Sequence, residues 1–189
     1  MKLEKDFYTR EDVVLIAKEL LGKYIFTKIN EKLTAGIITE TEAYAGVKDR
    51  ACHAYNNLRT KRTEVMYAEG GVAYVYFCYG MHHLFNIVTN KKNIPEAILI
   101  RAVKPIEGIK IILRRRKRKF LTDNICSGPG TVTQALGIKT MHTGITLTGN
   151  IIWIEDRGIK YNESEIKKNP RIGVNYAGTD ALLPYRFGI

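Results

Sequence analysis

The sequence predicts a mixed α/β fold in a single domain covering residues 1–189. A helical stripe near the start is followed by several short segments rich in β-branched and aromatic residues, and no segment of the chain repeats. The length suits one hydrophobic core that needs neither disulfides nor metal ions to stabilise it.

The first predicted element is a helix. Thr9 is a suitable N-cap, apolar residues recur at helical spacing from Val13 onward, and Gly22 follows as a stop signal. The next two segments, 23–27 and 33–40, have the composition of β-strands and flank a short polar turn, which predicts a hairpin.

The second strand of this hairpin leads into an acidic and aromatic segment. Because side chains alternate along a strand, Glu40, Glu42 and Tyr44 are expected on one face. Residues 49–69 are polar, carry several cations and have no clear period, which predicts a long loop or irregular helix. Long ordered loops in compact domains often carry function.

The rest of the chain continues the mixture of strands and helices. Gly80 and Met81 separate two strand-like segments, so Tyr79, Met81 and His82 are expected at or near a hairpin tip. An exposed tip of this composition indicates contact with an apolar partner.

Arg101 ends an apolar segment and, if buried, needs an anionic partner. The remaining expected elements are strands 72–79, 83–89 and 97–103, a helix at 105–113, a glycine-rich turn at 127–131 leading into a helix that ends at 136, strands 145–147 and 151–154, and a glycine-rich loop at 171–178.

The chain is strongly basic. It carries 30 Lys and Arg against 19 Asp and Glu, a net charge of +11, which favours polyanions as partners. No apolar stretch is long enough to span a membrane and the start lacks a signal-peptide core, so a soluble intracellular protein is expected. The consecutive cations at 114–119 are typical of a solvated, mobile segment, and phosphate contact is the alternative.

The cysteines and histidines do not predict a metal site. Cys52, Cys78 and Cys126 are far apart and odd in number, so small buried side chains are expected rather than disulfides or zinc ligands. His82 and His83 are adjacent, so in a strand they point to opposite faces. We expect neither a metal ion nor a cofactor.

The acidic and aromatic residues suggest a kind of chemistry. A carboxylate beside aromatic rings in a basic protein is suited to a pocket in which a flat heterocycle stacks while a water molecule is activated next to it.

An ordered set of motifs resembles the alkyladenine (3-methyladenine) DNA glycosylase family. Each motif alone is moderately specific, but together they cover about the whole chain in the family's order. The motifs are residues 40–46 (ETEAYAG), 51–53 (ACH), 71–81 (GVAYVYFCYGM), 86–87 (NI), 99–102 (LIRA), 126–129 (CSGP) and 171–174 (RIGV).

The resemblance implies a fold and an activity. The fold is a curved antiparallel sheet flanked by helices (α+β), with a protruding β-hairpin that intercalates into DNA. The activity is that of a monofunctional DNA glycosylase of base-excision repair, which hydrolyses the N-glycosidic bond of a flipped-out alkylated or deaminated purine such as 3-methyladenine, 7-methylguanine, ethenoadenine or hypoxanthine. The expected partner is double-stranded DNA with a damaged purine. The expected protein is a monomer, cytoplasmic with the nucleoid if prokaryotic and nuclear if eukaryotic.

The resemblance also assigns roles to individual residues. Glu42 matches the general base that activates water, and Arg101 and the Val174 carbonyl match groups that hold this water. The implied substrate-binding residues are Tyr44, His53 and Tyr76, which would sandwich the base, with Asn86, which would disfavour the amino group of guanine, and Leu99. The implied DNA-intercalating residues are Tyr79, Met81 and His82.

Other classes stay open from the residues alone. A non-catalytic nucleic-acid-binding protein would explain the charge and the exposed aromatic residues. A metal-dependent nuclease could use Glu40, Glu42 and Asp49 as Mg²⁺ ligands. Arg101 could also be a structural partner of either glutamate.

Overall fold

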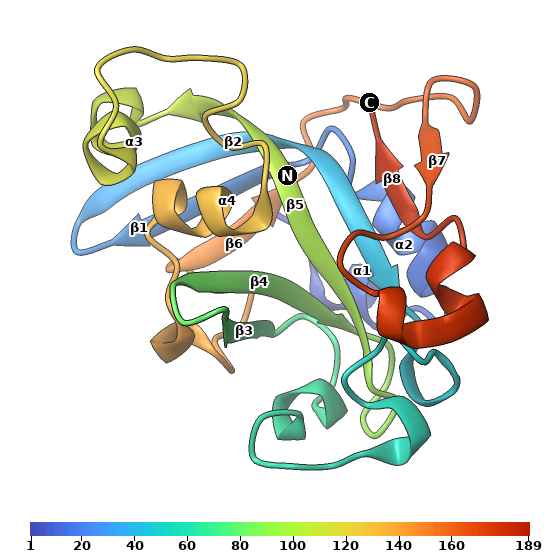
Figure 1. Cartoon of the computed structure of the whole chain (residues 1–189). Coiled ribbons are helices and arrows are strands. Elements are labelled where there is room, and N and C mark those ends of the chain that lie inside the picture. The colour runs from blue at the N-terminus through green and yellow to red at the C-terminus, as the bar shows by residue number, and fades with distance from the viewer.

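The computed structural model describes residues 1–189 and contains one curved, eight-stranded antiparallel sheet (Figure 1). The main strand order is β3-β4-β5-β2-β1-β6, and β8 pairs with both β2 and β7. The strands are β1 (Tyr24–Ile29), β2 (Lys32–Tyr44), β3 (Ala73–Cys78), β4 (His82–Thr89), β5 (Glu96–Glu107), β6 (Ile152–Glu155), β7 (Lys167–Asn169) and β8 (Arg186–Gly188). The α-helices are α1 (Lys5–Tyr8), α2 (Val13–Glu19), α3 (Ile109–Arg116) and α4 (Pro129–Leu136). The predicted mixed α/β fold with an antiparallel sheet flanked by helices is confirmed.

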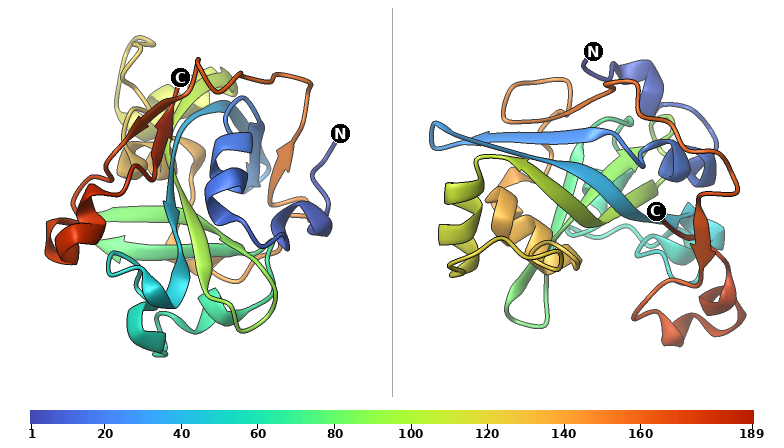
Figure 2. Two further views of the ribbon diagram at one scale, coloured as in Figure 1. Left: turned by 90° about the vertical axis from the view of Figure 1, so that its right-hand side faces the viewer. Right: turned by 90° about the horizontal axis from the view of Figure 1, so that it is seen from above.

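Helices cover both sides of the sheet. Helix α2 packs against β2, whereas α4 packs against β4 and β5, and Figure 2 shows the two helices on opposite sides of the strands. A core of 28 buried apolar residues joins these layers, including Ile16 of α2, Ile38 of β2 and Leu136 of α4. None of the helices is both long and apolar enough to cross a lipid bilayer.

The predicted first hairpin is confirmed, and its turn explains its register. Asn30 and Glu31 are the two turn residues between β1 and β2, with φ angles of 51° and 56°. Two left-handed turn residues match the twist of antiparallel strands. The second strand extends to Tyr44, and register shifts on either side of Glu40 mark its irregular middle.

The predicted start of the first long helix was wrong. Asp12 is the N-cap of α2, and its side chain accepts a hydrogen bond from the Leu15 amide at 2.8 Å. Thr9 instead follows the short helix α1, which the sequence did not predict. Tyr8, which is buried, is the last residue of α1, and Asp12 is the residue before α2.

The predicted helix at 105–113 was also misplaced. Strand β5 continues to Glu107, and Gly108, with φ of 68°, ends the strand so that α3 begins at Ile109.

The first half of the basic segment 114–119 belongs to α3 and is ordered, contrary to the prediction of a mobile segment. Arg115 donates to the carbonyl of Ala135 at 3.0 Å and Arg116 to that of Ile125 at 2.9 Å. Residues 117–119 are exposed.

Two further differences concern the later part of the chain. Residues 145–147 are not a strand, because only one isolated bridge, between Val72 and Thr146, forms there. Tyr74 belongs to the core as expected, whereas Cys78, unlike Cys52 and Cys126, is only partly buried.

The predicted irregular segment at 49–69 is confirmed. It contains the short 3-10 helices η2 (Tyr55–Asn57) and η3 (Glu64–Tyr67), preceded by η1 (Gly46–Lys48).

Candidate active site

A row of directly paired residues crosses the sheet and forms the base of a site. In antiparallel pairs, directly opposed residues project to the same face of the sheet. The row therefore brings together side chains that lie far apart in the sequence. Its members are Tyr74 of β3, Asn86 of β4, Leu99 of β5, Glu42 of β2 and Arg186 of β8.

A cavity of about 330 Å³ lies beside this row. That volume falls in the range of small-ligand pockets. Most of the residues expected at the substrate or the water line it, namely Tyr44, His53, Tyr76, Asn86, Leu99, Arg101 and Val174, and so does Tyr79. Met81 and His82 do not line it, because they face a second cavity of about 570 Å³ beside α4.

Glu42 lies behind the wall of the first cavity and is completely buried. One carboxylate oxygen accepts a hydrogen bond from the Ile172 amide at 2.8 Å, and the other accepts one from the Tyr44 hydroxyl at 2.9 Å. Burial raises the pKa of Glu42 above its ordinary value, and the Arg101 guanidinium and these hydrogen bonds oppose part of that rise. The same-face arrangement expected for Glu42 and Tyr44 is confirmed.

Arg101 lies between two carboxylates. Its Nη1 is 3.4 Å from Glu42, and its Nε is 3.5 Å from Glu40. Glu40 is also held by Arg186, at 2.6 Å. The expectation that a buried Arg101 needs an anionic partner is confirmed. Its Nε is nevertheless buried without a hydrogen bond, which leaves one donor of the guanidinium free.

The aromatic rings of the cavity are held in fixed orientations. Nδ1 of His53 lies 2.8 Å from the hydroxyl of Tyr74, and the His53 ring meets Tyr76 edge to face, with centroids 4.7 Å apart. Burial lowers the pKa of His53 to about 4, and the Arg62 guanidinium acts in the same direction. His53 is therefore neutral at physiological pH.

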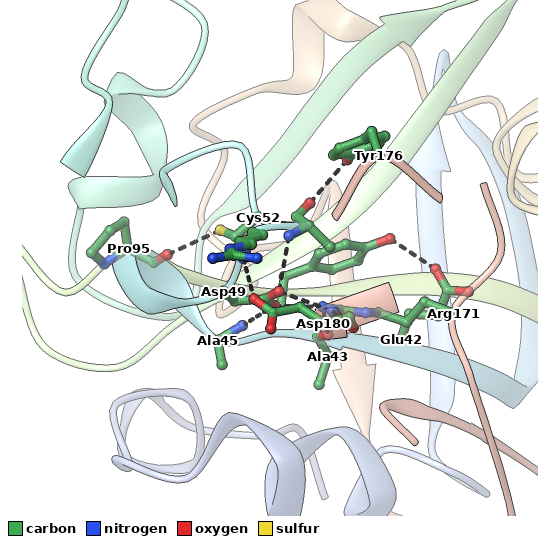
Figure 3. A network of polar contacts seen from close by, with 12 residues as sticks. Glu42, Ala43, Ala45, Asp49, Cys52, Pro95, Arg171, Tyr176 and Asp180 are labelled. Carbon is green, nitrogen blue, oxygen red and sulfur yellow. Dashed lines mark hydrogen bonds and ion pairs between the residues drawn. The ribbon is translucent and has the colours of Figure 1, made fainter. Parts of the chain in front are cut away.

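A buried ion pair that the sequence did not reveal supports the site. Arg171 donates to Asp49 at 2.8 Å and to the carbonyl of Ala43 at 2.9 Å, and its guanidinium lies 4.9 Å from the centre of the Tyr44 ring. Asp49 also accepts from two backbone amides of its own loop. Figure 3 shows how this network, with Asp180, joins the loop after β2 to the loop before β8.

This network also bears on the nuclease alternative. The Asp49 carboxylate is committed to a guanidinium and to backbone amides, and Glu40 is committed to Arg186. Glu40 and Glu42 share Arg101 as a partner, whereas Asp49 pairs with Arg171, so the three acids do not converge on one open site as a set of Mg²⁺ ligands must.

The β3–β4 hairpin ends in an exposed tip next to the cavity. The Tyr79 side chain is 83% exposed and that of Met81 is 69% exposed. Tyr79 and Gly80 have φ angles of 52° and 67°, which turns the chain tightly between the two strands. The hairpin projects away from the sheet in the view from above (Figure 2, right).

A basic domain with a carboxylate behind an aromatic cavity, and an exposed tyrosine on a hairpin beside it, has the features of a DNA glycosylase. The comparison with known families agrees. The model of methylpurine-DNA glycosylase (MPG) matches residues 6–189, so the chain belongs to that family. It is accordingly a DNA N-glycosylase, a hydrolase that acts on DNA in repair.

Bacterial relatives resemble the chain along its length, and each is named "Putative 3-methyladenine DNA glycosylase". The relative from Chlamydia felis is 47% identical over 189 residues, covering 98% of this chain and 94% of its own. That from Alkaliphilus oremlandii is 42% identical, covering 100% of this chain and 96% of its own. That from Clostridium acetobutylicum is 41% identical, covering 100% and 94%.

Proposed function

We propose that the protein is a monofunctional glycosylase that excises alkylated or deaminated purines from duplex DNA with a water activated by Glu42. The observation that carries this proposal is the buried Glu42 carboxylate, hydrogen-bonded to the Tyr44 ring that lines the aromatic cavity. The substrates are 3-methyladenine, 7-methylguanine, ethenoadenine and hypoxanthine. The protein acts as a monomer, in the cytoplasm with the nucleoid if prokaryotic and in the nucleus if eukaryotic.

The target base must leave the helix before it can react. Unstacking costs a few kcal/mol and is least costly for damaged or mispaired bases. Tyr79 enters the vacated space and offsets part of this cost, with Met81 and His82 beside it in the groove. The flipped base then stacks in the cavity among Tyr44, His53 and Tyr76, whose contacts contribute roughly 1–3 kcal/mol for each stacked base.

The water is held between Glu42 and the groups around it. A carboxylate offers about four lone pairs, and hydrogen bonds from Ile172 and Tyr44 use two of them. The Arg101 guanidinium, whose Nη1 is 3.4 Å from Glu42, is a donor for the water. The Val174 carbonyl, which accepts one backbone hydrogen bond from Ala177, has a second lone pair for it.

The reaction then follows from this arrangement. The bond between C1′ and the base nitrogen breaks with its electrons going to the base, and the sugar gains oxocarbenium character. The water oxygen bonds to C1′ while Glu42 takes its proton, and the negative carboxylate stabilises the positive sugar. Cationic alkylated bases leave directly, whereas hypoxanthine must be protonated. No lysine lines the cavity, so a Schiff-base step has no nucleophile there.

A smaller role concerns selection among bases. Asn86 is buried, and its amide donates to the Tyr74 carbonyl at 3.2 Å, which fixes its orientation beside Leu99. A rigid polar group there disfavours the amino group of normal guanine, the role that the family resemblance implies for Asn86.

The decisive experiment supplies a duplex with one defined lesion and measures free base in the presence of EDTA. We expect release of at least one of 3-methyladenine, ethenoadenine and hypoxanthine, and an abasic strand that breaks only on later alkali or heat. A metal-dependent nuclease would lose activity in EDTA and break phosphodiesters directly. Release of none of the three bases would refute the proposal.

Replacement of Tyr79 by alanine tests the intercalation. We expect Tyr79→Ala to slow base release from a paired lesion by about ten- to a hundredfold, because no side chain then stacks in the gap that the extrahelical base leaves in the helix. Single-turnover rates on duplex DNA measure the effect. The control is the same lesion in single-stranded DNA, where no gap needs filling and the loss should be much smaller. Equal losses on both substrates would argue against a wedge.

The pH dependence tests the general base. Glu42 must be ionised to accept a proton, and its raised pKa means that ionisation is lost at a higher pH than for an exposed glutamate. We therefore expect the rate on 7-methylguanine, which needs no protonation to leave, to fall on the acid side with an apparent pKa above 4.5. A rate that stays constant below that pH would contradict the role of Glu42.

A further inference from the structure

Arg62 lies at the rim of the aromatic cavity and contacts two rings of its wall. Its Nη2 is 3.2 Å from Nε2 of His53, and its guanidinium is 4.8 Å from the centre of the Tyr76 ring. The side chain is exposed and lines the cavity. It therefore occupies the open side of the two rings against which a flipped base is proposed to stack.

This contact fixes the tautomer of His53. A guanidinium has donors and no acceptor, so Nε2 of His53 must present its lone pair to Arg62. The ring proton is then on Nδ1, from which it is donated to the Tyr74 hydroxyl oxygen at 2.8 Å. Both ring nitrogens of His53 therefore have a hydrogen-bond partner: Nδ1 contacts the Tyr74 hydroxyl, and Nε2 contacts Arg62.

The same contact places a permanent positive charge on the cavity wall. A guanidinium over a tyrosine face occupies the position that attracts cations. Bases methylated at N3 or N7 are cationic in DNA, whereas hypoxanthine and ethenoadenine are neutral. A cationic base against Tyr76 meets Arg62 as a like charge and competes with it for the ring. A neutral base that stacks there is not repelled by this charge.

We infer that Arg62 is a positioning and specificity-determining residue, which holds His53 in its neutral Nδ1–H tautomer and favours neutral over cationic bases in the pocket. The inference rests on the proposed base excision for its substrate classes. The Arg62–His53 contact itself can be tested without turnover.

The first test is nitrogen-15 NMR of the histidine rings in the full chain. The chain has 4 histidines, and the signals that disappear in His53→Asn identify His53. We expect a protonated Nδ1 in the wild type and in Arg62→Lys, which keeps a cationic donor. Arg62→Met keeps an apolar stem without the donor and should give mixed tautomers. Lys61→Met is the matched control, because it removes an exposed cation from the neighbouring position. An unchanged His53 spectrum in Arg62→Met would overturn the inference.

The second test compares kcat/KM for 7-methylguanine with kcat/KM for hypoxanthine in otherwise identical duplexes. We expect Arg62→Met to raise this ratio about two- to fivefold, the change that corresponds to one exposed cation–π contact. Lys61→Met and Arg62→Lys should leave the ratio at the wild-type value. A ratio that does not change in Arg62→Met, even with slower rates on both bases, would mean a structural role only. A wild type that releases neither base would instead defeat the proposed function, and the NMR result would still decide the contact.

Discussion

Replacing Glu42 by glutamine should abolish most base release while leaving the protein folded and able to bind DNA. Glutamine has nearly the same shape and can still accept the hydrogen bond from the Ile172 amide, so the wall of the cavity is preserved. It cannot take a proton from water or carry the negative charge that stabilises the sugar cation. We expect the single-turnover rate to fall by about 10²–10⁴-fold, the usual contribution of a general base.

Glu40→Gln is the matched control for this prediction. Glu40 precedes Glu42 by two residues in the same strand, and both glutamates contact Arg101. Glu40 is also held by Arg186 and does not contact Tyr44. If activity depends on Glu42 as a base, Glu40→Gln should retain far more activity than Glu42→Gln. Equal losses would mean that the charge cluster as a whole supports the fold. Wild-type rates in Glu42→Gln would remove Glu42 from the mechanism.

Affinity for a lesion duplex separates chemistry from binding. The Glu42 carboxylate is buried behind Tyr44 and does not line the cavity, so its loss should leave the dissociation constant close to that of the wild type. Fluorescence anisotropy with labelled duplex measures it. Affinity that falls together with the rate would show that Glu42 shapes the pocket rather than reacting in it.

Strand alternation predicted much of the sheet face that carries Glu42 and Tyr44. The same-face arrangement of Glu42 and Tyr44 follows from a period of two residues, and the structure confirms it. The β3–β4 hairpin likewise follows from the alternation around its turn at Gly80. These features depend on residues close in sequence, where local geometry leaves few alternatives.

Contacts made from loops or between distant segments could not be predicted in this way. Arg171 and Asp49 are separated by 122 positions, and nothing in either segment indicates that they pair. The contact of Arg62 with His53 spans a loop without a regular period, where no repeat fixes the direction of a side chain. The misplaced start of α3 has another cause. Its boundary depends on Gly108, which ends a strand rather than a helix.

Removing the charge of Asp49 should destabilise the protein more than most single substitutions. Asp49→Asn keeps the shape of the side chain but leaves the buried Arg171 guanidinium without its anion. Breaking a buried ion pair by removing one partner costs about 3–5 kcal/mol, because an uncompensated charge remains in a poorly solvated place. For a chain of this length, that corresponds to a melting temperature lower by about 10 °C. Calorimetry measures the shift.

Two comparisons make this prediction specific. Glu64→Gln removes the same charge from the exposed pair with Arg59, where water replaces the lost partner, so the melting temperature should change little. The double variant Asp49→Asn/Arg171→Met removes both charges and should recover part of the stability, because the unpaired cation is gone. If Asp49→Asn melts no lower than Glu64→Gln, the ion pair does not hold the two loops together. The position of the Arg171 guanidinium over the Tyr44 ring would then depend on hydrogen bonds to backbone carbonyls, such as that of Ala43, alone.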